Sequence, residues 1–310
     1  MKICFSIAPF SVLVESIEIR MSKKEFTICP LSGSSVLEPL TGYPGLVKSQ
    51  PLGFVFYKQI PTTDELNAHY AQYRRNDYLS PLTIKRYEEL LDSFEPFRKS
   101  GKLLDLGCGI GHFAGVAKAK GWDVYGTEFS DEAIAICAAK GIHMQQGKTH
   151  KDMFEAESFD VITSFEVIEH INYPNEEMEC IHHFLRKGGL FYCTTPNFNA
   201  IERYVLKNEY SVIGYPEHLS YYTPRSLDFL MKRHGFKKKY LKTTGISISK
   251  LRRHKSVKEA AGGISSDSPD EILRKNLESS FFARSLKQTA NTLLTLLGLG
   301  NALKAAYIKK

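Results

Sequence analysis

The chain has 310 residues, 43% of them apolar, and a formal net charge of +7 at neutral pH. Such a chain can bury a full core, so these numbers exclude an intrinsically disordered protein and predict one α/β domain with additions. Its six cysteines form no C-x-x-C pair, which excludes a disulfide framework and favours reduced thiols in the cytoplasm. The sequence has no run of about eighteen apolar residues that would predict a transmembrane helix.

Residues 1–25 are expected to be an extension that precedes the folded domain. An apolar stretch, residues 3–14, follows a single lysine, but Pro9 interrupts it, Glu15 follows it and no small-x-small cleavage site is present. These features exclude a secretory signal peptide. Met21 opens a Met-Ser-Lys-Lys sequence of ordinary bacterial type, and we expect the functional chain to start there rather than at Met1.

Residues 26–60 predict a small β-rich lobe. Two turns in it resemble the two knuckles of a zinc ribbon: residues 29–33, Cys-Pro-Leu-Ser-Gly, and residues 49–53, Ser-Gln-Pro-Leu-Gly. Tetrahedral zinc needs four sulfur or imidazole ligands, and of the four expected cysteines only Cys29 is present. We therefore expect a degenerate ribbon that keeps its hairpins and binds no zinc. An unrelated β-rich lobe is the alternative.

Residues 61–100 predict helices that lead into the main domain. The pattern rests on apolar and aromatic side chains at helical spacing, which are Leu66, Tyr70, Tyr73, Tyr87, Leu90, Leu91 and Phe94. Such a segment can cover a ligand pocket as a lid. Aromatic residues at this spacing more often belong to a core, and we expect that role here.

Residues 101–250 alternate between apolar runs and amphipathic stretches. The runs predict strands near 102–105, 123–128, 142–146, 159–164, 189–195, 238–241 and 245–250, and the stretches predict helices near 112–120, 131–140, 176–185 and 226–233. This alternation is typical of an α/β fold with a doubly wound, mostly parallel, seven-stranded Rossmann-like sheet. Ligands of such sheets bind at the carboxyl ends of the strands.

A glycine-rich loop follows the first of these strands. Asp105 is followed by glycines 107, 109 and 111, and Glu128 stands at the tip of the second strand. A dinucleotide fingerprint would need its third glycine at position 112, which is His112, so a nicotinamide or flavin site is excluded. The acidic residue at the strand tip is placed to accept hydrogen bonds from the two hydroxyls of a ribose.

This D-x-G-x-G-x-G loop, the acidic strand tip and the later strand at residues 159–162 resemble the first motifs of class I S-adenosylmethionine-dependent methyltransferases. The resemblance implies that the cofactor is S-adenosylmethionine and that the last strand of the sheet is antiparallel. It also implies a set of cofactor-binding residues, which are Asp105, Gly107, Gly109, Gly111, Glu128, Phe129, Phe165 and Glu166. Of these, the glycines would approach the methionine part, Glu128 would hold the ribose and Phe129 would lie against the adenine. The acidic residue that family members place after strand three is missing, because Lys148 occupies that stretch.

The chemistry is expected in two segments, residues 164–170 and 215–222. Methyl transfer to a hydroxyl needs an acceptor held in line with the methyl group and a base for its proton, and histidine is the natural base near neutral pH. The second segment resembles the Tyr-x-Glu-His-x-x-Tyr motif of methyltransferases that act on nucleotide-linked deoxysugars. We assign catalytic or substrate-side roles to Tyr215, His218 and His170.

The Glu-Val-Ile-Glu-His run at residues 166–170 leaves a second mechanism open. It resembles ubiquinone-pathway O-methyltransferases and also RNA 2'-O-methyltransferases that bind magnesium through two glutamates and two histidines. The matching set here would be Glu166, Glu169, His170 and His218. We expect His218 to act as a base without a metal, and whether a metal is used stays open at this point.

Residues 251–310 are expected to form a basic loop and C-terminal helices. Eleven lysines and arginines and no acidic residue lie between positions 232 and 258. This patch can attract a phosphorylated substrate, a nucleic acid or an anionic membrane. Residues 261–269 predict a flexible loop, and residues 286–308 predict two apolar helical pieces broken at 298–300. We expect these pieces to pack on the domain or on a second subunit of a homodimer; peripheral membrane association is the alternative.

The sequence therefore predicts a cytoplasmic methyltransferase that acts on a small molecule and not on DNA. The ribbon-like lobe, the segment 217–222 and the C-terminal helices favour a hydroxyl of a sugar or polysaccharide precursor, which can be nucleotide-linked, as the acceptor. A quinone precursor and RNA are the alternative acceptors. A non-catalytic S-adenosylmethionine-binding protein is the alternative from another functional class.

Overall fold

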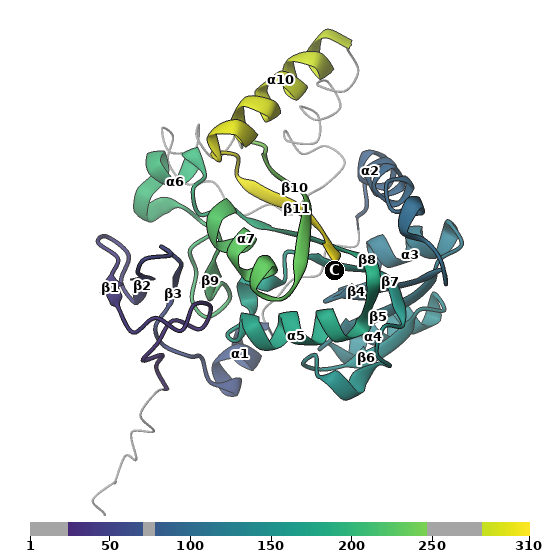
Figure 1. Ribbon diagram of the computed structural model, residues 1–310, viewed down its shortest axis with the longest axis horizontal. Helices are drawn as coiled ribbons and strands as arrows, with labels where there is room; N and C mark the ends of the chain where they lie inside the picture. Colours follow the sequence, from purple (N-terminus) through teal and green to yellow (C-terminus); the bar gives the residue numbers. More distant parts are fainter. Residues whose placement is uncertain (1–23, 71–77, 247–280) are drawn as a thin grey trace, which may run out of the picture.

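The computed structural model describes residues 24–70, 78–246 and 281–310 (Figure 1). It contains a seven-stranded sheet with helices on both faces and a separate four-stranded antiparallel sheet near the N-terminus. The start at Met1 or Met21 and the loop at residues 261–269 lie outside the described residues.

The large sheet has the order β10-β11-β8-β7-β4-β5-β6. Five strands run parallel to one another: β4 (Lys102–Leu106), β5 (Asp123–Glu128), β6 (His143–Gln146), β7 (Phe159–Phe165) and β8 (Leu185–Pro196). The strand β11 (Ala302–Lys309) runs antiparallel to both β8 and β10 (Phe236–Thr244). The predicted Rossmann-like, mostly parallel seven-stranded sheet is confirmed.

The helices α2 (Pro81–Asp92), α3 (His112–Ala119) and α4 (Asp131–Ala139) cover one face of this sheet, and α5 (Pro174–Phe184) and α7 (Pro224–Arg233) cover the other. The described residues also form α1 (Thr63–Tyr70), α6 (Ile201–Leu206) and α10 (Phe281–Leu297). Short 3₁₀ turns are η1 (Glu95–Phe97), η2 (Lys151–Met153), η3 (Ile168–His170) and η4 (Lys207–Glu209). Hydroxyl side chains cap the N-termini of α2, α4 and α7. Ser80, Ser130 and Thr223 each accept a hydrogen bond from a backbone amide in the first turn.

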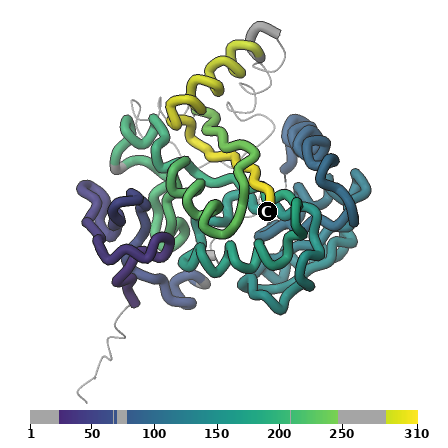
Figure 2. Tube along the Cα trace, in the orientation of Figure 1, coloured from purple at the N-terminus to yellow at the C-terminus, as the bar shows by residue number. Residues whose placement is uncertain are grey.

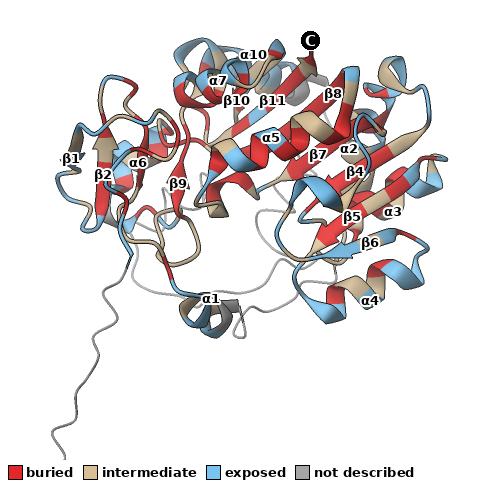
Figure 3. Cartoon of the chain, turned by 60° about the horizontal axis from the view of Figure 1, so that its bottom comes forward, coloured by how far each residue is buried: buried red, intermediate tan, exposed pale blue. Residues whose placement is uncertain are grey.

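Two hydrophobic cores form because neighbouring residues of a strand point to opposite faces. Leu103 belongs to the core beneath α2, α3 and α4, whereas the next residue, Leu104, belongs to the core beneath α5 and α7. The central strands are buried along most of their length, and the edge strand β6 is mostly exposed (Figure 3). The aromatic residue Tyr87 and Leu91 of α2 lie in the first core, which confirms the core role predicted for that helix. Tyr73 lies outside the described residues.

The N-terminal lobe is a four-stranded sheet in the order β1 (Leu37–Pro39), β2 (Leu46–Ser49), β3 (Val55–Tyr57) and β9 (Ser220–Tyr221). The two knuckle-like turns have matching backbone bonds, from Gly33 to Cys29 (2.9 Å) and from Gly53 to Ser49 (2.7 Å). Since β9 comes from the segment predicted to face the substrate, the lobe extends beyond residues 26–60 and is joined to that segment.

The C-terminal part differs from the prediction. The first expected helical piece is α10, but the second is the strand β11, inserted between β8 and β10 and buried along much of its length. Gly300 allows the chain to approach β10 closely just before β11 begins, because a Cβ at this position would lie 2.4 Å from the backbone of Thr243. The strand expected at 245–250 falls mainly outside the described residues, and β11 fills the antiparallel position instead. In Figure 2 the tube passes from α10 back into the body before the chain ends.

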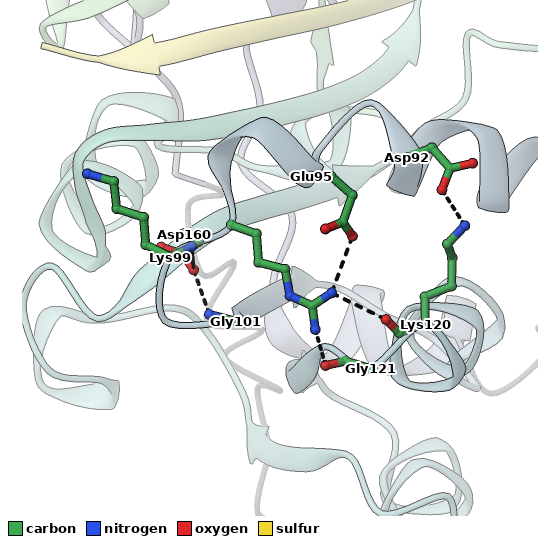
Figure 4. A network of polar contacts seen from close by, with 8 residues as sticks. Asp92, Glu95, Lys99, Gly101, Lys120, Gly121 and Asp160 are labelled. Carbon is green, nitrogen blue, oxygen red and sulfur yellow. Dashed lines mark hydrogen bonds and ion pairs between the residues drawn. The ribbon is translucent and has the colours of Figure 1, made fainter.

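A buried carboxylate fixes the connection between α2 and β4 (Figure 4). Asp160, fully buried in β7, accepts bonds from the backbone amides of Lys99 and Gly101 (both 2.7 Å) and from Arg186 Nε (2.5 Å). Burial by itself would raise the pKa of Asp160, but these bonds outweigh it and lower the pKa. The network holds the strand that carries the glycine loop.

None of the helices among residues 24–70, 78–246 and 281–310 combines the length and the apolar character that a membrane crossing requires.

Candidate functional site

The glycine loop at the carboxyl end of β4 has two glycines that pack tightly and one that faces open space. Gly107, Gly109 and Gly111 all have positive φ values, of 62°, 54° and 73°. A Cβ on Gly107 would lie 2.6 Å from Val167, and a Cβ on Gly111 would lie 2.8 Å from Cys137 Sγ. A Cβ on Gly109 would meet no protein atom within 4 Å. The predicted close approach of a ligand therefore has room at Gly109.

Glu128 connects the tip of β5 to this loop. One carboxylate oxygen accepts a bond from the amide of Gly109 (2.9 Å) and the other accepts one from the amide of Phe129 (2.7 Å). The side chain of Phe129 is 70% exposed, which leaves a flat apolar ring available beside the carboxylate. The structure thus brings three of the predicted cofactor residues together at one edge of the sheet.

Asp105 lies below the loop. Its carboxyl is only 2% exposed and accepts a bond from Thr163 Oγ1 at 2.7 Å. Burial raises the pKa of Asp105 to about 7, against the opposing effect of the Thr163 bond. Asp105 therefore lies under the glycine loop, at the end of β4. Its direct contact with the cofactor stays a prediction.

The end of β7 forms an aromatic wall beside the loop. Phe165 lies 4.7 Å from Phe113, centroid to centroid, and 6.1 Å from Tyr87 of α2. The sequence predicted a core role for Tyr87 and kept a lid over the ligand pocket as the alternative for its segment. Its helical spacing alone carried no signal of that contact.

Glu166 directly follows β7 in the left-handed region, with φ 54°, and its amide donates to the carbonyl of Thr194 at 3.0 Å. The residue is exposed, yet surrounding protein desolvates its carboxyl and raises the pKa of Glu166. Glu166 lies at the same carboxyl edge of the sheet as the glycine loop, because β4 and β7 are parallel neighbours.

Three further predicted residues form a compact cluster close to Glu166. The ligand atoms of Glu169, His170 and His218 lie within 4.8 Å of one another, and the two imidazole rings are 4.8 Å apart. A bond from the amide of Leu219 to the carbonyl of Glu169 (2.8 Å) joins the two segments that sequence analysis singled out. Glu166, which was grouped with these residues as a fourth metal ligand, is not in the cluster that the described residues form.

Backbone carbonyls fix the tautomers of both histidines. Nδ1 of His170 lies 2.8 Å from the carbonyl of Glu217, and Nδ1 of His218 lies 2.6 Å from the carbonyl of Val212. Because a carbonyl only accepts, both Nδ1 atoms carry the hydrogen and both Nε2 atoms keep a lone pair. Burial, and then the charge of His218, lower the pKa of His170.

Glu169 completes the cluster with a buried carboxyl that is 2% exposed. One oxygen accepts a bond from Thr195 Oγ1 at 2.9 Å, and the other, Oε1, has no hydrogen-bond partner in the part of the chain that the structure describes. Oε1 lies 4.0 Å from Nε2 of His170. Burial, and then the charge of Glu166, raise the pKa of Glu169 well above its usual value. An unpaired buried oxygen beside two imidazole lone pairs fits a proton-transfer site or a divalent cation.

Tyr215 lies apart from the three-residue cluster, and its hydroxyl serves a structural connection. It accepts a bond from Gln59 Nε2 (2.7 Å) and donates one to Glu65 of α1 (3.0 Å). Burial, and then the Glu65 bond, raise the pKa of Tyr215 to about 12, which disfavours a role as base. These contacts give Tyr215 a positioning role between α1 and the N-terminal lobe, and its catalytic role stays a prediction.

Comparison with known proteins agrees with this geometry. A family model described as "Methyltransferase domain" matches residues 70–241, more than half of the chain. The chain belongs to this family. The methyltransferase domain that the sequence resemblance implied is thereby confirmed.

The curated relatives of this methyltransferase include the ubiquinone biosynthesis O-methyltransferase of Roseobacter denitrificans, with 31% identity over 157 residues that cover 49% of this chain and 60% of the relative. The protein of the same name from Sinorhizobium fredii is 34% identical over 105 residues, which cover 32% of this chain and 42% of the relative. The chain thus spans about half of the length of these relatives.

Two solved structures share the fold. A methyltransferase from Archaeoglobus fulgidus has a TM-score of 0.50 at 18% identity and covers 74% of this chain and 93% of its own. Phosphoethanolamine N-methyltransferase 2 of Haemonchus contortus, solved with S-adenosyl-L-methionine, has a TM-score of 0.51 at 18% identity and covers 82% of this chain and 62% of its own.

Proposed function

We propose that this methyltransferase transfers the methyl group of S-adenosylmethionine to a phenolic hydroxyl of a quinone-precursor type of acceptor. The proposal rests on the Nε2 lone pairs of His170 and His218. Both lie next to the carboxyl of Glu169, beside the glycine loop. The names of the curated relatives support this acceptor class. They favour the quinone precursor, which the sequence analysis held as its alternative, over the sugar hydroxyl that it preferred.

S-adenosylmethionine would lie across the carboxyl ends of β4 and β5. In this arrangement the open space at Gly109 receives the methionine part and Glu128 accepts bonds from the ribose hydroxyls. The exposed ring of Phe129 covers one face of the adenine. The cofactor is the source of the methyl group, and its sulfonium leaves as a neutral thioether.

The acceptor hydroxyl is deprotonated at His218. Its Nδ1 is held by the carbonyl of Val212, so Nε2 is the atom that takes the proton. The phenolate oxygen would then be placed to accept the methyl group that S-adenosylmethionine supplies when bound, with the methyl ether and S-adenosylhomocysteine as products. The ring of His170, held by the carbonyl of Glu217, fixes the position of the His218 ring through their edge contact.

The same three side chains fit a divalent cation. Glu169 Oε1 and the Nε2 atoms of His170 and His218 would hold it, and the carbonyls bonded to both Nδ1 atoms supply the outer contacts that metal-binding histidines usually have. A bound cation would lower the pKa of the acceptor hydroxyl.

The test is transfer of labelled methyl from S-adenosylmethionine to catechol and, in parallel, to a nucleotide-linked sugar. We expect a methylated catechol product and no labelled sugar. Labelling of the sugar alone would overturn the phenolic proposal in favour of the sugar hydroxyl. If neither probe is labelled although S-adenosylhomocysteine binds, the proposal fails in favour of a non-catalytic binding protein.

A further inference from the structure

A row of side chains crosses four strands at the edge of the proposed site. Phe165 of β7 pairs with Thr194 of β8, Thr194 pairs with Lys304 of β11, and Lys304 pairs with Lys242 of β10. Residues that pair directly across strands point to the same face of the sheet. The row therefore begins at the aromatic wall and ends in two lysines.

The two lysines are an unfavourable pair by themselves. Like charges placed directly opposite each other on antiparallel strands repel and destabilise the sheet. Burial and then the charge of Arg86 of α2 lower the pKa of Lys304, the carboxylate of Glu166 opposes this shift, and Lys287 of α10 lowers the pKa further. Four cations from four elements thus converge on one place.

Lys304 lies close enough to Glu166 for the two charges to act on each other. Thr194, its cross-strand neighbour, binds the amide of Glu166 through its carbonyl at 3.0 Å. Like Glu166, Lys304 is an exposed residue whose charged end is desolvated by the surrounding protein. Each of these two charges favours the charged form of the other group.

We infer that Lys304 and Lys242 form an anion-binding subsite for the methyl acceptor, with Arg86 at its rim. The acceptor would carry a carboxylate or a phosphate group in addition to the hydroxyl that is methylated. The subsite lies next to the aromatic wall of Phe165 and Tyr87. An aromatic ring can therefore lie on that wall while its anionic group reaches the lysines. This inference rests on the proposed function, and it narrows the acceptor class to anionic compounds.

Acceptor binding to the complex with S-adenosylhomocysteine tests the subsite without turnover. The probes are 3,4-dihydroxybenzoate, its neutral methyl ester and inorganic pyrophosphate, each titrated by calorimetry. We expect Lys304→Met to lower the affinity for the carboxylate or for pyrophosphate by about ten- to hundredfold. This is the range for a lost hydrogen bond to a charged group. The ester should bind the parent and the variant alike, and Lys304→Arg should retain anion binding.

Lys237→Met is the matched control, because Lys237 is an exposed lysine of β10 that pairs with Ile308, toward the opposite end of that strand. It should bind all three probes as the parent does. Melting curves of Lys304→Met that overlay those of the parent exclude a folding defect.

The possible outcomes separate the subsite from the reaction. Lys304-dependent binding of the carboxylate supports a carboxylic-acid acceptor, and Lys304-dependent binding of pyrophosphate alone supports a phosphorylated one. Either result supports the subsite even if catechol is never methylated. If neither anion binds in a manner that depends on Lys304, the subsite is refuted, even where catechol turnover upholds the proposed function.

Discussion

Glu128 offers a quantitative test of the cofactor arrangement. Its two carboxylate oxygens accept bonds from the amides of Gly109 and Phe129, at 2.9 and 2.7 Å, and are proposed to accept bonds from the ribose hydroxyls as well. In Glu128→Ala the hydroxyls of a bound ribose lose these acceptors. An unmade bond of this kind costs about 1 to 3 kcal/mol, which is about five- to 150-fold in affinity.

Calorimetry with S-adenosylhomocysteine measures this loss. Comparison with the 2'-deoxyribose analogue separates the ribose contact from a general loosening of the loop. The parent should prefer the natural ribose, and Glu128→Ala should bind both compounds with nearly the same weak affinity. Glu155→Gln, at an exposed position outside the site, serves as the control. Unchanged affinity in Glu128→Ala would refute the assignment of Glu128 to the ribose.

Three further predictions concern Asp105, Asp160 and the metal content of the N-terminal lobe. The pKa of Asp105 is raised from 3.8 to about 7 in the folded protein, so stability falls as the pH rises through this window; Asp105→Asn should therefore raise the melting temperature more at pH 8 than at pH 5. Equal shifts at both pH values would contradict a buried acid. Asp160→Asn should lower the free energy of unfolding by about 3 to 5 kcal/mol in denaturant titrations, because it leaves Arg186 without its charge partner. The surface variant Asp92→Asn, as control, should lose less than about 1 kcal/mol. Elemental analysis of the untagged protein should find no stoichiometric zinc, since Cys29 lacks the other expected ligands, and one equivalent of zinc would show that the lobe is an intact metal ribbon.

The parallel half of the sheet could be predicted from the sequence. The strands β4 and β7 are mainly apolar runs of the right length, and β4, β5 and β7 begin and end close to the predicted positions. The glycine pattern after β4 and the acidic residue at the tip of β5 located the loop, because each position needs a particular backbone conformation or charge. The residues Gly109 and Glu128 accordingly meet in the structure.

The C-terminal strand could not be predicted in the same way. Residues 302–309 alternate poorly and are rich in alanine, so their pattern fits a helix as well as a strand that is buried on both faces. The insertion between β8 and β10 decides the conformation, and that is a tertiary effect. The opposition of Lys242 and Lys304 follows from this register and has no signal in the sequence.

The cluster of Glu169, His170 and His218 was predicted in part. The sequence identified the residue types, and it could not show that both histidines bind backbone carbonyls through Nδ1. It also grouped Glu166 with them, whereas Glu166, whose backbone is left-handed with φ 54°, lies outside the cluster that the described residues form. Such details depend on contacts between segments distant in the chain.

The most direct test of the account is labelled methyl transfer to catechol by the parent and by His218→Gln, with and without a chelator. If His218 is the base, the variant should lose roughly two to four orders of magnitude in turnover while its affinity for S-adenosylhomocysteine stays the same. Unchanged activity of the parent with the chelator would assign the proton to His218 alone. Loss of activity that magnesium or manganese restores would assign a cation to the cluster. Full activity of His218→Gln would contradict the account in both forms, since each gives this imidazole a direct role in activating the acceptor.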